Sequence, residues 1–301
     1  MSRSPQDSQI YRIETYQLTA GDVLPMLTFR LFEGQTFFRH GFTMRDGGVS
    51  SGIYSSLNLS YTRGDDPECV TENFRRVAHV FDTDLSKIVT SDQTHTTNIR
   101  RVTFEDAGAG ILKKRGFSDI DGMICNEPGL LLGCFFADCV PLFFADPVHH
   151  AIGLSHSGWR GTVGRMGEKT LLAMNDAFGT DPADVLCGIG PSICMDCYEV
   201  SEDVIEQAAA CFCGPTRRPE VSERIPESMI FQKTSPEKYH LNLWKANERI
   251  LLESGVLPEH LAVGDVCTCC HPQLFFSHRA SHGKRGNLGA FMILQDSADR
   301  V

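Results

Sequence analysis

Three short segments of this chain contain residue types that bind transition metals: Gln93-Thr94-His95, Ala137-Asp138-Cys139 and His156-Ser157-Gly158. Each of them offers one imidazole or one thiolate at the end of an apolar run. Two imidazoles and one thiolate, with a fourth position open, are typical of a catalytic zinc site. Spacing alone supports this weakly, because the three residues lie 44 and 17 positions apart and form no local ligand motif. A buried cysteine is usually only a small apolar side chain.

A second group of potential ligands consists of cysteines in the C-terminal half. Cys194-x-x-Cys197 and the run Cys267-x-Cys269-Cys270-His271 have spacings that suit a structural tetrahedral zinc. About 70 residues separate the two groups, however, which is far outside a zinc-ribbon pattern. The pattern therefore favours reduced thiols near a surface loop, with a structural zinc site as the alternative.

The composition is that of a soluble globular protein. The chain has 301 residues with a formal net charge of −10, 42% hydrophobic and 22% charged. This charge argues against a broad nucleic-acid interface, which needs clustered Lys and Arg. No stretch of 18 residues is free of charges and turn formers, and residues 1–10 have no apolar core. We therefore expect no membrane segment, reduced thiols and a cytoplasmic location.

Helices are predicted where apolar residues recur on one face. The clearest is at 67–81, where Val70, Phe74 and Val77 follow the favourable start Asp66-Pro67. Further helical patterns begin after Gly158 and end near residue 178, and others are expected at 201–210 and 241–254. Residues 212–236 are rich in charges and proline and are expected to form an exposed excursion.

Strands are predicted from short apolar runs bounded by turn residues, and the central ones must position the candidate ligands. The runs at 129–136, 140–145 and 151–154 are continuous and apolar, as in strands buried on both faces. Cys139 and His156 would then lie at the ends of adjacent buried strands. Further strands are expected at 29–32, 36–42, 185–189 and 291–294, with an extended stretch from residue 88 to His95.

These elements predict an α/β fold, a single domain with mixed β-sheet layers and flanking helices. No repeat or linker divides the chain. We expect residues 1–28 to be a loosely ordered lead segment and residues 29–301 to form the catalytic domain. The sequence does not set the oligomeric state.

Ten short pieces occur along the chain in an order that is specific to one family. Together they resemble the YfiH family, also called the polyphenol oxidase or laccase-domain family, over roughly residues 39–295. The pieces are residues 40–50, Ser56-Leu57-Asn58-Leu59, Glu72-Asn73, Gln93-Thr94-His95, Asp121-Gly122, residues 137–141, residues 156–161, residues 190–193, Tyr198-Glu199-Val200 and residues 275–279. The resemblance implies that His95, Cys139 and His156 bind a metal, usually zinc.

The resemblance also implies an enzyme that acts on purine nucleosides and phosphate. Family members are described as zinc-dependent purine nucleoside phosphorylases, which are transferases, with methylthioadenosine phosphorylase and adenosine deaminase (hydrolase) activity. Older descriptions give copper-dependent phenol oxidation. Multicopper oxidases need several His-x-His pairs, and this chain has none. The residues therefore favour nucleoside chemistry over oxidation by several coppers.

The candidate catalytic residues are Asp138 and Arg279. The familiar zinc deaminase pattern, His-x-Glu with Pro-Cys-x-x-Cys, is missing, so deamination here needs a different proton carrier. Asp138 is the carboxylate nearest to Cys139, suited to act as a general acid or base. Alternatively, it accepts an imidazole N–H and fixes a ligand tautomer. In an extended strand it would point away from Cys139, unless the chain bends before Pro141.

Phosphorolysis requires cations and backbone donors that hold inorganic phosphate. Arg45 and the glycine-rich loop that follows it form a candidate cradle, although such loops are often simple turns. Arg160 and Arg279 are alternative cations on the metal side, and two amides suit sugar hydroxyls or base edges. The candidate substrate-binding residues are therefore Arg45, Ser50, Asn58, Gln93 and Arg160.

Other functions are compatible with the same residues. One is a hydrolase that edits a cell-wall precursor, a role proposed for some relatives, and another is a copper-dependent polyphenol oxidase. A thiol-rich metal-binding protein without enzyme activity is a third. The three ligands accept copper with higher intrinsic affinity than zinc, so zinc is the expected metal and copper the alternative.

Overall fold

Two six-stranded β-sheets, stacked face to face, form the centre of the computed structural model, which describes residues 2–18, 21–214 and 218–295. The first sheet has the order β1 (Tyr11–Gln17), β2 (Val23–Phe29), β3 (Phe38–Thr43), β15 (Leu288–Leu294), β7 (Leu131–Phe136) and β4 (Ile88–Thr90). The second has the order β14 (Leu261–Val263), β10 (Leu186–Ile189), β8 (Val140–Asp146), β9 (Ala151–Ser157), β6 (Gly122–Cys125) and β5 (Ile99–Arg101).

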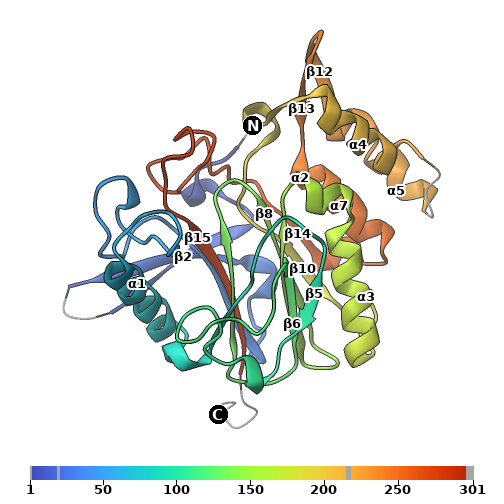
Figure 1. The fold of residues 1–301 in the computed structure, drawn as a ribbon. Coiled ribbons are helices and arrows are strands. Elements are labelled where there is room, and N and C mark those ends of the chain that lie inside the picture. Colours follow the sequence, from blue (N-terminus) through green and yellow to red (C-terminus); the bar gives the residue numbers. More distant parts are fainter. Residues whose placement is uncertain (1, 19–20, 215–217, 296–301) are drawn as a thin grey trace.

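Helices cover the outer faces of the two sheets (Figure 1). Helix α1 (Pro67–Val80) packs on the first sheet, and α3 (Met166–Phe178) and α7 (Leu243–Glu253) pack on the second. The remaining α-helices are α2 (Trp159–Val163), α4 (Glu202–Phe212), α5 (Pro219–Arg224) and α6 (Glu227–Ile230). Short 3₁₀ helices lie at Pro5–Asp7, Arg30–Phe32, Gly52–Tyr54, Leu85–Lys87, Phe104–Asp106, Met195–Cys197 and Pro258–His260.

Strand β15 shows why these sequences become strands buried on both sides. All seven of its residues are buried. Phe291 and Ile293 contribute to the core beneath α1, whereas Ala290 and Met292 contribute to the core between the sheets. Successive side chains of a strand point to opposite faces, so a continuous apolar run is required here.

Most predicted elements are confirmed. The α/β class with mixed sheets and flanking helices is observed, and the strands at 129–136, 140–145, 151–154 and 185–189 correspond to β7, β8, β9 and β10. The helices at 67–81, 201–210 and 241–254 correspond to α1, α4 and α7, and the helical pattern after Gly158 contains α2 and α3. Within the described residues, no helix is both long enough and apolar enough to cross a bilayer.

The expectation of a loosely ordered lead over residues 1–28 is wrong for 2–18 and 21–28; residues 1, 19 and 20 lie outside the described residues. Strands β1 and β2 pair antiparallel along their whole length, from Tyr11 opposite Phe29 to Gln17 opposite Val23, and the expected boundary after residue 28 falls inside β2. The predicted strand at 29–32 is a 3₁₀ turn beyond its first residue. Strand β1 is the edge of the sheet and is only partly buried, so its apolar signal is weak.

The excursion expected at 212–236 is more ordered over 212–214 and 218–236 than its composition indicated; residues 215–217 lie outside the described residues. It contains α5, α6 and β12 (Phe231–Ser235), which pairs with β13 (Lys238–Leu241) beside β11 (Glu199–Ser201) in a small third sheet. Val221, Ile225 and Ile230 are buried in the same core as α7. The hairpin of β12 and β13 projects from the main body (Figure 1).

Candidate metal centre

The two sheets bring the three predicted ligands together at one edge. Strands β8 and β9 are antiparallel, with Pro141 opposite His156, so Cys139, just before β8, lies beside the end of β9. His95 lies in the segment that leaves β4 of the first sheet and enters β5 of the second. One ligand atom from each of His95, Cys139 and His156 lies within 4.8 Å of the other two. The ends of adjacent strands therefore meet as the sequence predicted.

A buried carboxylate, Asp121, fixes the loop that carries His95. Its oxygens accept hydrogen bonds from the main-chain N–H groups of Thr94 (3.1 Å), His95 (3.1 Å) and Thr96 (2.8 Å). His95 has a positive φ of 67°, an unfavourable conformation for a residue with a side chain. The three bonds to one carboxylate hold the backbone in this conformation.

The same carboxylate orients the second imidazole. Asp121 Oδ1 lies 2.8 Å from His156 Nδ1, and the Asp121 carbonyl accepts from His156 N at 2.7 Å. Because Nδ1 is engaged in this way, Nε2 is the ring nitrogen left for a metal. Asp138 was one candidate for the carboxylate that accepts an imidazole N–H; for His156, that carboxylate is Asp121. The sequence contained Asp121 in a recognisable piece, but nothing in it linked this residue to His95 or His156.

The charges in this cluster favour a Cys139 thiolate beside a protonated His156. Burial by itself raises the pKa of the Cys139 thiol, but His156 and His95 lower it to about 6. Burial likewise lowers the pKa of His156, whereas the Cys139 thiolate and Asp121 raise it to about 9. Cys139 is therefore a thiolate at neutral pH, which is the form that binds metals. Metal binding would displace the proton from His156.

Gly158 leaves the space that the three ligands need. A Cβ atom at this position would lie 3.0 Å from Cys139 Sγ and 3.3 Å from His95 Cδ2. The donor set and this opening together fit a zinc ion held by His95, Cys139 and His156, since imidazole and thiolate are the ligands that zinc prefers.

We expect Gly158→Ala to weaken metal binding by about 10-fold to 100-fold, the range found when groups that orient ligands are changed. The added methyl group would push Cys139 and His95 apart. Competition with a chromogenic chelator measures the affinity. Gly116→Ala is the matched control, because a Cβ at 116 meets no atom within 4 Å. Equal affinity in Gly158→Ala and wild type would contradict this account of the glycine.

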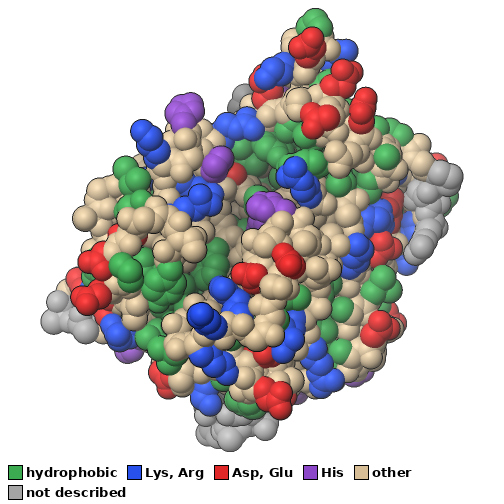
Figure 2. Space-filling view, viewed as in Figure 1, with side chains coloured by type: hydrophobic (Ala, Val, Ile, Leu, Met, Phe, Trp, Pro, Cys, Tyr) green, Lys and Arg blue, Asp and Glu red, His purple; other side chains and the backbone are tan. Residues whose placement is uncertain are grey.

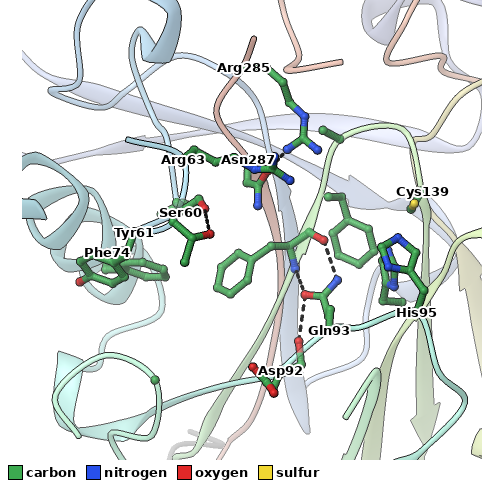
Figure 3. A pocket seen from close by; sticks show the side chains of 18 of the residues that line it. Ser60, Tyr61, Arg63, Phe74, Asp92, Gln93, His95, Cys139, Arg285 and Asn287 are labelled. Carbon is green, nitrogen blue, oxygen red and sulfur yellow. Dashed lines mark hydrogen bonds between the residues drawn. The ribbon is translucent and has the colours of Figure 1, made fainter. Parts of the chain in front are cut away.

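A cavity of about 350 Å³ opens on the metal centre. Figure 2 shows a hollow near the middle of this face, with histidine and with lysine or arginine side chains around it. All three candidate ligands line the cavity, together with Arg63, Arg115 and Arg285 and the amides of Gln93 and Asn287. Figure 3 shows Arg63 and Arg285 across the cavity from His95 and Cys139.

Two of these arginines, Arg63 and Arg285, give the cavity a strong positive charge. Burial and the nearby Arg63 lower the pKa of Arg285 to about 10. Arg285 Nε is buried and has no hydrogen-bond partner among the described residues. In the described ranges, neither Arg63 nor Arg285 forms an ion pair with a carboxylate. By contrast, Arg115 Nη1 lies 3.5 Å from Asp92 Oδ1. Two guanidinium groups that lack a paired carboxylate and line one cavity are suited to bind an anion.

Gln93 lines the cavity as predicted for a substrate-binding residue. Its amide also links the first sheet to the ligand loop, because Nε2 donates to the Phe135 carbonyl and Oε1 accepts from Phe135 N, both at 2.7 Å. The other predicted substrate residues do not line this cavity.

Arg45, Ser50 and Asn58 hold loops in place outside the cavity. Arg45 donates to the carbonyls of Ser55 and Pro272 and stacks on Phe276. Ser50 Oγ donates to Asp65 at 2.6 Å, and the Asn58 amide donates to the same carboxylate at 2.9 Å. Main-chain N–H groups of the loop after Arg45 already donate to Ser56 and Asn73, and the loop does not line this cavity. Arg160 is exposed and stacks on Trp159.

Asp138 directly precedes the candidate ligand Cys139, and a hydrogen bond joins its side chain to the backbone of Arg279. The backbone bends at Asp138, which has a φ of 90°, so residues 137–140 are not a regular strand. Its carboxylate accepts from Thr268 Oγ1 and from Arg279 N, each at 2.7 Å. The Arg279 guanidinium donates to the carbonyls of Cys197 (3.0 Å) and Glu199 (2.9 Å).

Most of the chain, including all three candidate ligands, matches one known family. The model of the family described as "Multi-copper polyphenol oxidoreductase laccase" matches residues 39–295, and the chain belongs to this family.

Relatives of known name are similar over most of their length. YlmD of Bacillus subtilis, named a purine nucleoside phosphorylase, is 34% identical over 258 residues, 85% of this chain and 88% of that protein. YlmD of Geobacillus stearothermophilus, with the same name, is 36% identical over 84% of this chain and 88% of its own.

Solved structures confirm the fold. The crystal structure of Bacillus licheniformis YfiH superimposes with a TM-score of 0.82 at 32% identity, covering 90% of this chain and 96% of that one. The structure of YlmD from Geobacillus stearothermophilus gives a TM-score of 0.80 at 34% identity, covering 93% and 99%. The resemblance to the laccase-domain family is thereby confirmed.

Proposed function

We propose that the protein is a zinc-dependent purine nucleoside phosphorylase that also deaminates adenosine and cleaves methylthioadenosine. One observation carries this proposal: a single cavity contains the His95–Cys139–His156 cluster on one side and the guanidinium groups of Arg63 and Arg285 on the other (Figure 3). The names of the relatives support the same reaction. The volume of about 350 Å³ lies within the usual range for small-molecule sites.

The arginine pair suits the phosphate in such a reaction. In phosphorolysis a phosphate oxygen forms a bond to C1′ of the ribose while the bond from C1′ to the base nitrogen breaks, giving the base and ribose 1-phosphate. Arg63 and Arg285 would hold the phosphate through charge-assisted hydrogen bonds and keep its oxygens facing the sugar.

The opposite side of the cavity would hold the metal. When bound there, zinc supplies a Lewis acid and lowers the pKa of water to roughly 7. Asp121 keeps His156 in the required tautomer. We propose that Asp138 and Arg279 contribute by positioning: Asp138 holds the bend before Cys139, and Arg279 fastens that bend to the 197–199 segment.

Product analysis tests the proposal directly. Purified protein is incubated with inosine and with adenosine, with and without phosphate, and the products are separated by chromatography. We expect hypoxanthine from inosine only when phosphate is present, and inosine from adenosine without it. If all mixtures remain unchanged with zinc-loaded protein, the nucleoside function is wrong.

Replacing Arg285 by alanine should raise the KM for phosphate by about 10-fold to 100-fold, because a hydrogen bond to a charged group contributes about 1.5–3 kcal/mol. Arg63→Ala should act in the same direction. Deamination of adenosine, which uses no phosphate, should change much less. Lys284→Ala is the control, since Lys284 is exposed and does not line the cavity. A phosphate KM that stays at the wild-type value in both arginine variants would contradict the assignment of the anion site.

A further inference from the structure

Four cysteines form a second cluster, apart from the cavity. Strands β10 and β14 are parallel neighbours, with Ile189 opposite Val263, so the segments that follow them leave the same edge of the second sheet. A bridge between Ser192 and Cys267 continues this pairing, and Thr268 N donates to the Ser192 carbonyl at 3.1 Å. One segment carries Cys194 and Cys197 and the other carries Cys267 and Cys270. Their wide separation in sequence, which favoured isolated thiols, is thus overcome by the sheet.

The sulfur positions match those around one tetrahedral ion. All four Sγ atoms lie within 4.8 Å of one another; Cys270 Sγ is 3.9 Å from Cys194 Sγ and 3.5 Å from Cys197 Sγ. Sulfurs about 2.3 Å from a tetrahedral zinc are about 3.8 Å apart, whereas a disulfide requires about 2.05 Å. All four cysteines are free thiols. The spacing is therefore that of ligands around an ion.

Main-chain groups also point at the sulfurs, as expected around thiolates. Cys267 Sγ accepts hydrogen bonds from Cys194 N at 3.1 Å and from Cys270 N at 3.4 Å. The first of these N–H···S bonds joins the two segments, and the second lies within the segment of Cys267. Both hold Cys267 Sγ in place. Cys194 and Cys267 are buried, whereas Cys270 is exposed and leaves an entry path for an ion. Cys269 is not part of the cluster.

We propose that Cys194, Cys197, Cys267 and Cys270 bind one structural zinc ion, separate from the His95–Cys139–His156 centre. Four thiolates leave no open position, which is the arrangement of structural rather than catalytic zinc, and soft sulfur ligands exclude magnesium and calcium. This site is independent of the nucleoside function proposed above.

The zinc would stabilise the two segments that support Asp138. Ile193 N, next to Cys194, donates to the Asp138 carbonyl at 3.0 Å, and Thr268 Oγ1, next to Cys267, donates to the Asp138 carboxylate. Joining both segments through one ion therefore holds the bend that leads into Cys139. The four-cysteine cluster thus supports the backbone beside the His95–Cys139–His156 centre and takes no part in the reaction.

Zinc content and sulfur coordination test this proposal. Wild-type protein purified without chelator should contain two zinc ions per chain by elemental analysis, and Cys270→Ser should contain one and unfold at a lower temperature. Cys213→Ser is the matched control, because Cys213 is an exposed thiol outside the cluster, and it should retain two zinc ions.

The Cys139→Ala variant keeps the test decisive if Cys270→Ser does not fold. Its single remaining zinc should show four sulfur neighbours at about 2.3 Å by X-ray absorption spectroscopy. No zinc in this variant, a zinc with nitrogen or oxygen neighbours, or iron in its place would overturn the proposal. So would a zinc content that does not differ between wild type and Cys270→Ser.

Discussion

Cys139→Ala is expected to remove one zinc ion per chain and to lower kcat/KM for nucleoside turnover by at least about 10²-fold to 10³-fold, the size of effect when one group that stabilises a transition state is lost. Cys139 is the only thiolate among the three clustered ligands, and His95 and His156 cannot by themselves form a three-ligand site. His156 also loses one of the two anions that raise its pKa, and Asp121 remains. Elemental analysis and product chromatography measure the two effects.

Cys213→Ser serves as the control for thiol replacement in general, because this exposed cysteine lies outside both clusters. Thermal unfolding of both variants shows whether the fold is kept. Full zinc content and full activity in folded Cys139→Ala protein would exclude the His95–Cys139–His156 centre as the reaction site.

Asp121→Asn is expected to lower metal affinity by about 10-fold to 100-fold and the free energy of unfolding by about 1–3 kcal/mol. The carboxylate is fully buried and accepts from three main-chain N–H groups, from Thr96 Oγ1 and from the His156 ring. An asparagine offers one acceptor oxygen, and its NH₂ group would face donors. Both the conformation of His95 and the tautomer of His156 would be released.

The control for Asp121→Asn is Asp119→Asn, at a neighbouring exposed carboxylate that accepts from the Thr94 hydroxyl but contacts neither imidazole. Chelator competition gives the metal affinity and denaturant titration gives the stability. If Asp121→Asn matches Asp119→Asn in both measurements, the orienting role of Asp121 is wrong.

The sequence predicted the elements at the metal edge because their signals are local. Strands β8 and β9 are continuous apolar runs; Cys139 immediately precedes β8, and His156 lies near the end of β9. Their adjacency then required only that two consecutive strands pair. His95 also ends an apolar stretch, but it belongs to a loop between the sheets, and it was the family resemblance that implied that all three residues bind one metal.

The residues that complete the site had no such signal. Asp121, Arg63 and Arg285 reach the centre from distant parts of the chain, and nothing local distinguishes them from ordinary surface charges. Arg45 failed for the opposite reason: it stands in a glycine-rich loop that looks like an anion cradle, yet its guanidinium binds the carbonyls of Ser55 and Pro272. Local composition does not show which groups a long side chain binds in the folded protein.

Strand β15 has a consequence for how the polypeptide is made. It lies between β3 and β7, so a strand of residues 288–294 joins the two halves of the first sheet. While the ribosome is still synthesising the middle of the chain, β3 and β7 each present an unpaired edge and an uncovered apolar face. Contacts between segments so far apart in sequence form slowly. The nascent chain is therefore exposed to association with its neighbours until β15 has been translated.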